Sequence, residues 1–82
     1  MILVDVFVPA IDKTYNFSLD EAAPIAQIVE ELIELVERAE QTTFAGDRAH
    51  VQLVNKATRT ALPAQNTLKE CAVSTGSTLI LV

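Results

Sequence analysis

The first twenty residues carry two apolar patterns that predict a pair of strands. Residues Ile2–Val8 read ILVDVFV, a run of β-branched and aromatic residues that only Asp5 interrupts. A run of this length is too short for a helix of its own and is typical of a buried strand. A proline and an aspartate follow in PAIDK, as in a turn. In TYNFSL, residues 14–19, every second residue is apolar, which is the period of a strand with one buried face, so we expect a hairpin.

The period changes to that of an α-helix after residue 23. Apolar residues then recur at three- and four-residue spacings, and glutamates occupy most of the opposite face. The apolar stripe comprises Ile25, Ile28, Val29, Leu32, Leu35, Val36 and Ala39. Ser18 and Glu21 have the spacing of a capping box, but that start would put Pro24 in the second turn. We therefore expect the helix to begin at Pro24, which needs no N–H partner there, with Ala23 as a poor cap.

The second half of the chain predicts shorter strands separated by irregular segments. Residues 41–49 show no period and contain glycine and aspartate, so we expect a loop. The predicted strands are residues 50–54, 60–62 and 77–82. Pro63 ends the second of them. Between the last two strands, residues 65–76 are expected to cross the domain irregularly, with a single helical turn near residues 67–70.

These elements predict a single α+β domain that spans residues 1–82. The main elements follow the order ββαββ, with the short strand of residues 60–62 lying before the last one. One amphipathic helix of about four turns covers only one face of a small sheet, so we expect two layers. A chain of 82 residues is also too short to build a second core.

At this point the chain resembles the β-grasp, or ubiquitin-like, fold. The hairpin with DKT before the Y-F-L alternation, and the TLxxxxVxxxSTLxLV spacing within TLKECAVSTGSTLILV, are similar to the ubiquitin pattern. The helix segment AAPIAQIVEELIEL and the strand segment VQLVNKATRTAL are most similar to the YukD and EsaB family. The resemblance covers most of the chain. It implies a mixed sheet packed on one helix, and a cytosolic accessory component of type VII secretion in Gram-positive bacteria.

Charge and composition exclude several classes of protein. The net charge is −5, and the six basic residues form no stripe, so we expect no nucleic acid as partner. Five glutamates on the predicted helix, with Arg38, account for −4 of that charge, and we interpret them as a solvated face. A single cysteine allows no internal disulfide, and neither a basic leader nor a long apolar run suggests export or membrane insertion. We therefore expect a cytoplasmic protein.

The sequence offers no set of residues for catalysis, metal binding or cofactor binding. His50 and Cys71 are the two residues with obvious reactivity, and a zinc site or an iron–sulfur cluster needs three or four ligands. We expect Cys71 to be a small buried apolar residue. The NFS triplet fits a glycosylation acceptor only in a secreted protein, and FAGDR lacks the lysine of a phosphate loop. We therefore predict a protein that is not an enzyme and uses no cofactor.

The predicted sheet has one face without a covering layer. Placing Asp5 outward avoids the burial of an unpaired charge. The residues then expected to point inward are Ile2, Val4, Val6, Val8, Tyr15, Phe17, Leu19, Val51, Leu53, Leu79 and Leu81. The same parity leaves a candidate protein-binding patch on the open face, formed by Leu3, Phe7, Gln52, Val54, Ile80 and Val82. We expect its five apolar residues to be contiguous; the alternatives are that residues 67–77 or a loop cover the patch, or that it is a dimer interface.

The last predicted strand bears on how the protein acts. Ubiquitin and the sulfur carriers of its fold end in a flexible Gly-Gly tail, whereas here the terminal carboxylate sits on Val82, directly after Leu81. We therefore expect non-covalent binding to subunits of a secretion machine. Two alternatives remain open: a self-associating structural domain, and a carrier or modifier with an unrecognised activating enzyme.

Overall fold

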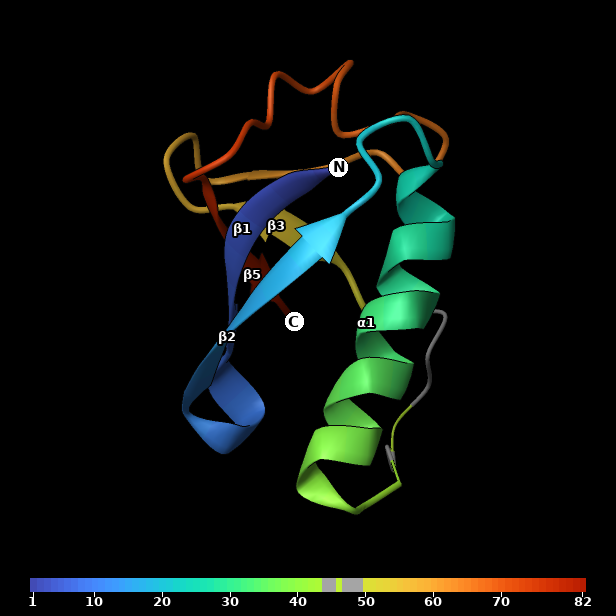
Figure 1. Ribbon diagram of the computed structural model, residues 1–82, viewed down its shortest axis with the longest axis vertical. Coiled ribbons are helices and arrows are strands. Elements are labelled where there is room, and N and C mark those ends of the chain that lie inside the picture. Colours follow the sequence, from blue (N-terminus) through green and yellow to red (C-terminus); the bar gives the residue numbers. More distant parts are fainter. Residues whose placement is uncertain (44–45, 47–49) are drawn as a thin grey trace.

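The computed structural model describes residues 1–43, 46 and 50–82, and consists of one helix on one side of a five-stranded sheet (Figure 1). Its elements are β1 (Ile2–Val8), the 3-10 helix η1 (Pro9–Ile11), β2 (Lys13–Leu19), α1 (Ile25–Glu40), β3 (Leu53–Asn55), β4 (Thr60–Ala61) and β5 (Thr78–Leu81). The strand order in the sheet is β2-β1-β5-β3-β4. The pair β1–β5 is parallel and the other neighbours are antiparallel. The predicted α+β architecture and the order of the elements are confirmed.

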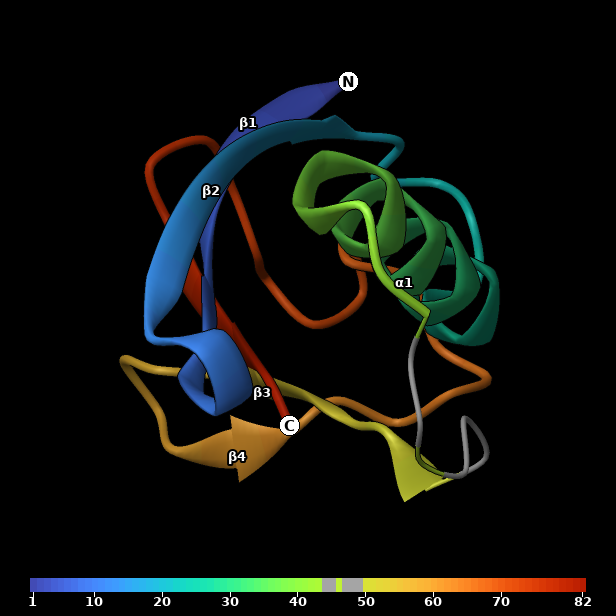
Figure 2. The ribbon, with the colours of Figure 1, turned by 90° about the horizontal axis from the view of Figure 1, so that it is seen from below.

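The core lies between α1 and the sheet, whose strands curve around one side of the helix (Figure 2). The inward parity predicted for the strands is confirmed. Seven of the eleven residues are buried, namely Val4, Val6, Val8, Leu19, Leu53, Leu79 and Leu81. The other four, Ile2, Tyr15, Phe17 and Val51, are half-buried and pack against that core. Alternation along each strand therefore fixed which face meets the helix.

The helix begins one residue later than predicted. Pro24 is the residue before the helix, with extended backbone angles, and Ile25 is the first helical residue. No side chain caps this end. Instead, the N–H of Ile25 donates to the carbonyl of Asn66 at 2.8 Å, and the N–H of Ala26 donates to the carbonyl of Ala64 at 3.0 Å. A distant segment of main chain thus satisfies the first free donors of α1, which is why the poor local cap is tolerated.

The predicted apolar stripe of α1 differs from the buried face of the helix after Leu32. Ile33, which the predicted stripe omitted, is buried, whereas Leu35 is half-buried and Ala39 is exposed. Ile33 and Leu35 lie on opposite flanks of the stripe, about 160° apart around the helix. A helical period alone cannot tell which flank the sheet covers.

The irregular segment after β4 contributes to the core. The predicted helical turn is present as one hydrogen bond from the N–H of Cys71 to the carbonyl of Thr67, at 3.1 Å. Leu68 and Val73 are buried in the same cluster as the helix and strands. In Figure 1 this segment runs across the top of the molecule, at the end where α1 begins. Cys71 is half-buried rather than buried, because it packs against the edge of the core.

The strands of the second half are shorter or shifted relative to prediction. β3 begins at Leu53 instead of residue 50, because its pairing with the last strand reaches only as far as Gln52, opposite Val82. It ends one residue later, at the buried Asn55, whose Oδ1 accepts a hydrogen bond from the N–H of Ala57 and starts the next turn. Most of the predicted 41–49 loop, including all of FAGDR except Gly46, lies outside the described residues.

Candidate functional site

The open face of the sheet contains a row of three apolar side chains from three neighbouring strands. Phe7 of β1 is in register with Ile80 of β5, and Ile80 is in register with Val54 of β3. All three are half-buried. We call Phe7, Ile80 and Val54 the open-face row. Because residues in register on one face of a sheet have their Cβ atoms within about 5.5 Å, the row is continuous.

Val82 and Gln52 extend this row at one side. The N–H of Val82 donates to the carbonyl of Gln52 at 2.9 Å, and the N–H of Gln52 donates to the carbonyl of Val82 at 2.6 Å. Both residues lie two positions along from members of the row, and therefore on the same face. The side chain of Val82 is 53% exposed. Five of the six predicted patch residues are thus brought together.

Leu3 does not belong to this patch, contrary to the prediction that all the apolar residues would be contiguous. Leu3 is 51% exposed and lies on the same face of β1 as Phe7. Between them lies Asp5, which is in register with Asn16 on one side and Thr78 on the other. The amide nitrogen of Asn16 donates to the carboxylate of Asp5 at 3.1 Å. A polar row therefore separates Leu3 from the other apolar side chains.

The segment of residues 67–77 was one candidate cover for this face. Its two buried side chains, Leu68 and Val73, belong to the core on the helix side of the sheet. The segment therefore does not place those side chains over the open-face row.

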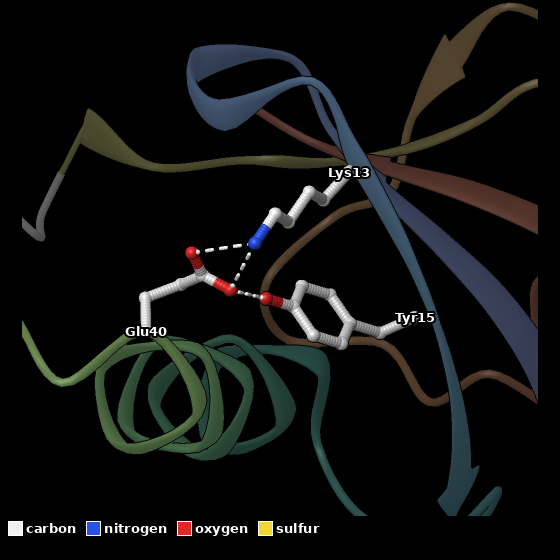
Figure 3. A network of polar contacts seen from close by, with 3 residues as sticks. All are labelled: Lys13, Tyr15 and Glu40. Carbon is white, nitrogen blue, oxygen red and sulfur yellow. Dashed lines mark hydrogen bonds and ion pairs between the residues drawn. The ribbon is translucent and has the colours of Figure 1, made fainter.

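A polar network that the sequence analysis missed joins the end of α1 to β2 (Figure 3). The ammonium of Lys13 donates to the two carboxylate oxygens of Glu40, at 3.0 and 3.1 Å, and the hydroxyl of Tyr15 donates to the same carboxylate. These hydrogen bonds, that of Tyr15 above all, lower the pKa of Glu40. The hydrogen bond to Glu40 raises the pKa of Tyr15. The available signal was an inward-facing tyrosine, whose hydroxyl needs a polar partner.

The network should raise the free energy of unfolding most where Glu40 is ionised and Tyr15 is protonated. A lowered pKa at Glu40 contributes stability above the ordinary carboxyl value of about 4.3, which is lost as pH falls through the folded value. A raised pKa at Tyr15 contributes stability below about 10, which is lost as pH rises through its folded value. We expect Tyr15→Phe to lower the urea midpoint at pH 7 and to have a much smaller effect at pH 3. Equal effects of Tyr15→Phe at both pH values would contradict the prediction.

The two candidate reactive residues join no metal-binding group within the described residues. Among the described residues, no three histidine, cysteine, aspartate or glutamate side chains come together as ligands would. His50 is exposed, and Cys71 is half-buried at the edge of the core. Within the described parts of the chain, no helix has the length and apolar character needed to cross a bilayer.

The fold defines the class of protein. Three solved structures similar to this chain are ubiquitin-like. The ubiquitin-like domain of EccD5 from Mycobacterium xenopi has a TM-score of 0.79 and 24% identity, over 99% of this chain and 91% of that one. Ubiquitin from Caldiarchaeum subterraneum has a TM-score of 0.72 and 12% identity, over 98% and 89%. A ubiquitin-like domain of an Arabidopsis thaliana protein has a TM-score of 0.72 and 17% identity, over 99% and 74%. The chain is a β-grasp, ubiquitin-like protein.

The particular family follows from the sequence itself. Residues 3–81 match the family described as "WXG100 protein secretion system (Wss), protein YukD". The chain belongs to the YukD family, and the predicted resemblance is confirmed. It is therefore a ubiquitin-like domain associated with type VII secretion. No curated protein matches the chain.

Proposed function

We propose that residues 1–82 act as one non-enzymatic, ubiquitin-like binding module in the cytoplasm, as an accessory or regulatory part of a type VII secretion machine. Its partners would be cytosolic or membrane-anchored protein subunits of that machine, and it would bind no nucleic acid, insert into no membrane and need no cofactor. The open-face row carries this proposal. Phe7, Ile80 and Val54 form continuous apolar surface on the side of the sheet opposite α1, and such surface usually marks a contact site.

The open-face row can supply enough free energy for a regulated contact. Each large apolar side chain that becomes fully buried contributes about 1.5–3 kcal/mol. Association costs and the partial burial already present reduce the total. Three such side chains, with Val82 at the border, are consistent with a complex of about micromolar affinity, near −8 kcal/mol.

Residues 81 and 82 are held in the sheet by main-chain pairing. Leu81 is buried and paired with Leu53, and Val82 exchanges two main-chain hydrogen bonds with Gln52. Non-covalent binding at the open face leaves this pairing intact, which is consistent with the proposal. Detection of Val82 in an isopeptide or thiocarboxylate by mass spectrometry would contradict this part of the proposal.

Replacing both Ile80 and Val54 by aspartate tests the proposed site. Both side chains are half-buried on the open face, so circular dichroism should show a retained fold. We expect co-purification with identified secretion subunits to weaken more than 100-fold, because two apolar contacts of about 1.5–3 kcal/mol each are lost. Leu3→Asp is the matched control, because Leu3 lies on the same face beyond the polar row. Capture that survives both charges would show that the open-face row is not the site. A dimer in sedimentation that the double aspartate variant abolishes would assign the face to a second copy.

A further inference from the structure

A second feature, separate from the open face, is the outer edge of β2, which pairs with no other strand in the described part of the chain. β2 is the outer strand at one side of the sheet and pairs with β1 along seven residues. In β1, the N–H of Asp5 and the carbonyl of Leu3 form hydrogen bonds with residues 76 and 77, just before β5. The N–H and carbonyl groups of the odd-numbered residues of β1 therefore point away from β2. Because hydrogen-bonding direction alternates along a strand, Tyr15 and Phe17 bond to β1. The N–H and carbonyl groups of Thr14, Asn16 and Ser18 then point outward.

From residue 14 to residue 19, this edge lacks the usual protections against strand addition. Exposed edges are normally kept short, charged, interrupted by proline or distorted by a bulge. From residue 14 to residue 19, β2 contains neither a charge nor a proline, and its register with β1 runs without a bulge. The opposite edge differs: β4 is only two residues long and is flanked by Arg59 and Pro63. An unprotected edge of this length is typical of a strand that receives a partner.

Apolar side chains border the edge on the helix side. The rings of Tyr15 and Phe17 stack with centroids 5.6 Å apart, and both are half-buried. Both rings also pack against the core between the sheet and α1.

The charges around the edge indicate which partner fits. Asp12 and Asp20 lie immediately beyond the two ends of β2, and both are exposed. The one basic residue of β2, Lys13, is already engaged by Glu40. A segment with a basic residue at each end would therefore find acidic groups at both ends of the strand.

We infer that the β2 edge binds an extended segment of a partner protein by strand addition, with apolar residues toward Tyr15 and Phe17 and a basic residue at each end. This site goes beyond the proposed function, because it uses a different part of the sheet. A peptide seated there extends the sheet to a sixth strand and leaves the open-face row uncovered.

A second copy of this chain fits the edge less well. Two copies could pair their β2 strands in an antiparallel arrangement. The register that uses all three outward-facing residues places Asn16 opposite Asn16 and Thr14 opposite Ser18 of the other copy. The same register places Asp12 opposite Asp20 of the other copy, at both ends. Like charges directly opposite each other destabilise a strand pair. A partner with basic ends meets no such repulsion.

The test uses the acetylated and amidated peptide Lys-Val-Thr-Val-Thr-Val-Lys as probe and amide hydrogen exchange followed by NMR as readout. We expect saturating peptide to slow exchange at Thr14, Asn16 and Ser18 at least tenfold. The peptide with glutamate at both ends should bind at least tenfold more weakly. Methylating the peptide nitrogens that face β2 should abolish the protection, whereas methylating those that face away should not; this comparison leaves the protein unchanged.

A protein variant provides a second arm. Ser18→Pro removes one outward N–H without breaking the pairing with β1, a position where an edge strand tolerates proline. It should weaken peptide binding at least tenfold, whereas the matched Ser18→Ala should not. Unchanged exchange at the three amides with peptide present would overturn the inference, as would protection that rises with protein concentration alone, which would assign the edge to a second copy. Protection confined to Phe7, Val54 and Ile80 would also overturn it and would leave the proposed function standing.

Discussion

Replacing Leu68 by alanine is expected to lower the free energy of unfolding by about 2–5 kcal/mol. Leu68 belongs to an irregular segment, yet its side chain is 0% exposed and lies in the core with α1 and the strands. Removing three carbons there loses their transfer free energy and leaves a cavity that the neighbours fill only in part. A domain of this length has a total stability of about 4–12 kcal/mol, so the variant should lose a large share of it.

Urea unfolding followed by circular dichroism measures this effect, and Leu3→Ala is the matched control. Leu3 has the same side chain but is 51% exposed, so its truncation should change stability by about 0.5 kcal/mol or less. For a chain of this size, each kcal/mol lost lowers the melting temperature by roughly 4–8 °C. Equal effects of the two substitutions would mean that residues 64–77 do not contribute to the core.

Truncation of Ile33 is expected to destabilise the protein more than truncation of Leu35. Ile33 is 3% exposed and packs in the core, so Ile33→Ala should cost about 2–5 kcal/mol. It also borders a groove of about 540 Å³ between α1, η1 and β5, which places the expected loss toward the lower end of that range. Leu35 lies on the other flank of the helix and is half-buried, so Leu35→Ala should cost about 1 kcal/mol or less.

The pair of helix variants separates packing from helix propensity. Alanine has the highest helix propensity, so both substitutions gain a similar small term, and their difference reports burial. Urea midpoints of the two proteins, compared at equal slopes, give that difference. A larger loss for Leu35→Ala would place the buried stripe of α1 where the sequence pattern first put it, and would contradict the structure.

The two proposed surfaces divide the sheet between them. The open-face row crosses its three central strands, and the free edge belongs to β2 at one side. A machine subunit that adds a strand to β2 therefore leaves the row available to another one. The polar row of Asp5, Asn16 and Thr78 separates Leu3 from the row and limits how far an apolar contact can extend.

Much of the fold could be predicted from residue order because the relevant forces act over short stretches of chain. Alternation in residues 14–19 and the apolar run Ile2–Val8 determined two strands and their inward faces. The change to a helical period determined α1 to within one residue at its start. Family membership could also be predicted, and the family match covers residues 3–81.

Other features depended on residues that are distant in sequence. The carbonyls of Ala64 and Asn66 accept hydrogen bonds from the first N–H groups of α1. Lys13 and Tyr15 donate hydrogen bonds to the Glu40 carboxylate. Leu68 is buried in the core between the helix and the strands. The sequence by itself determined the main elements and the inward faces of the strands, because the hydrophobic period is a local property. Only the tertiary structure decided which flank of α1 is buried, which apolar residues form one row and which strand has a free edge. Those outcomes depend on strand order and register, which are set by packing between segments far apart in the chain.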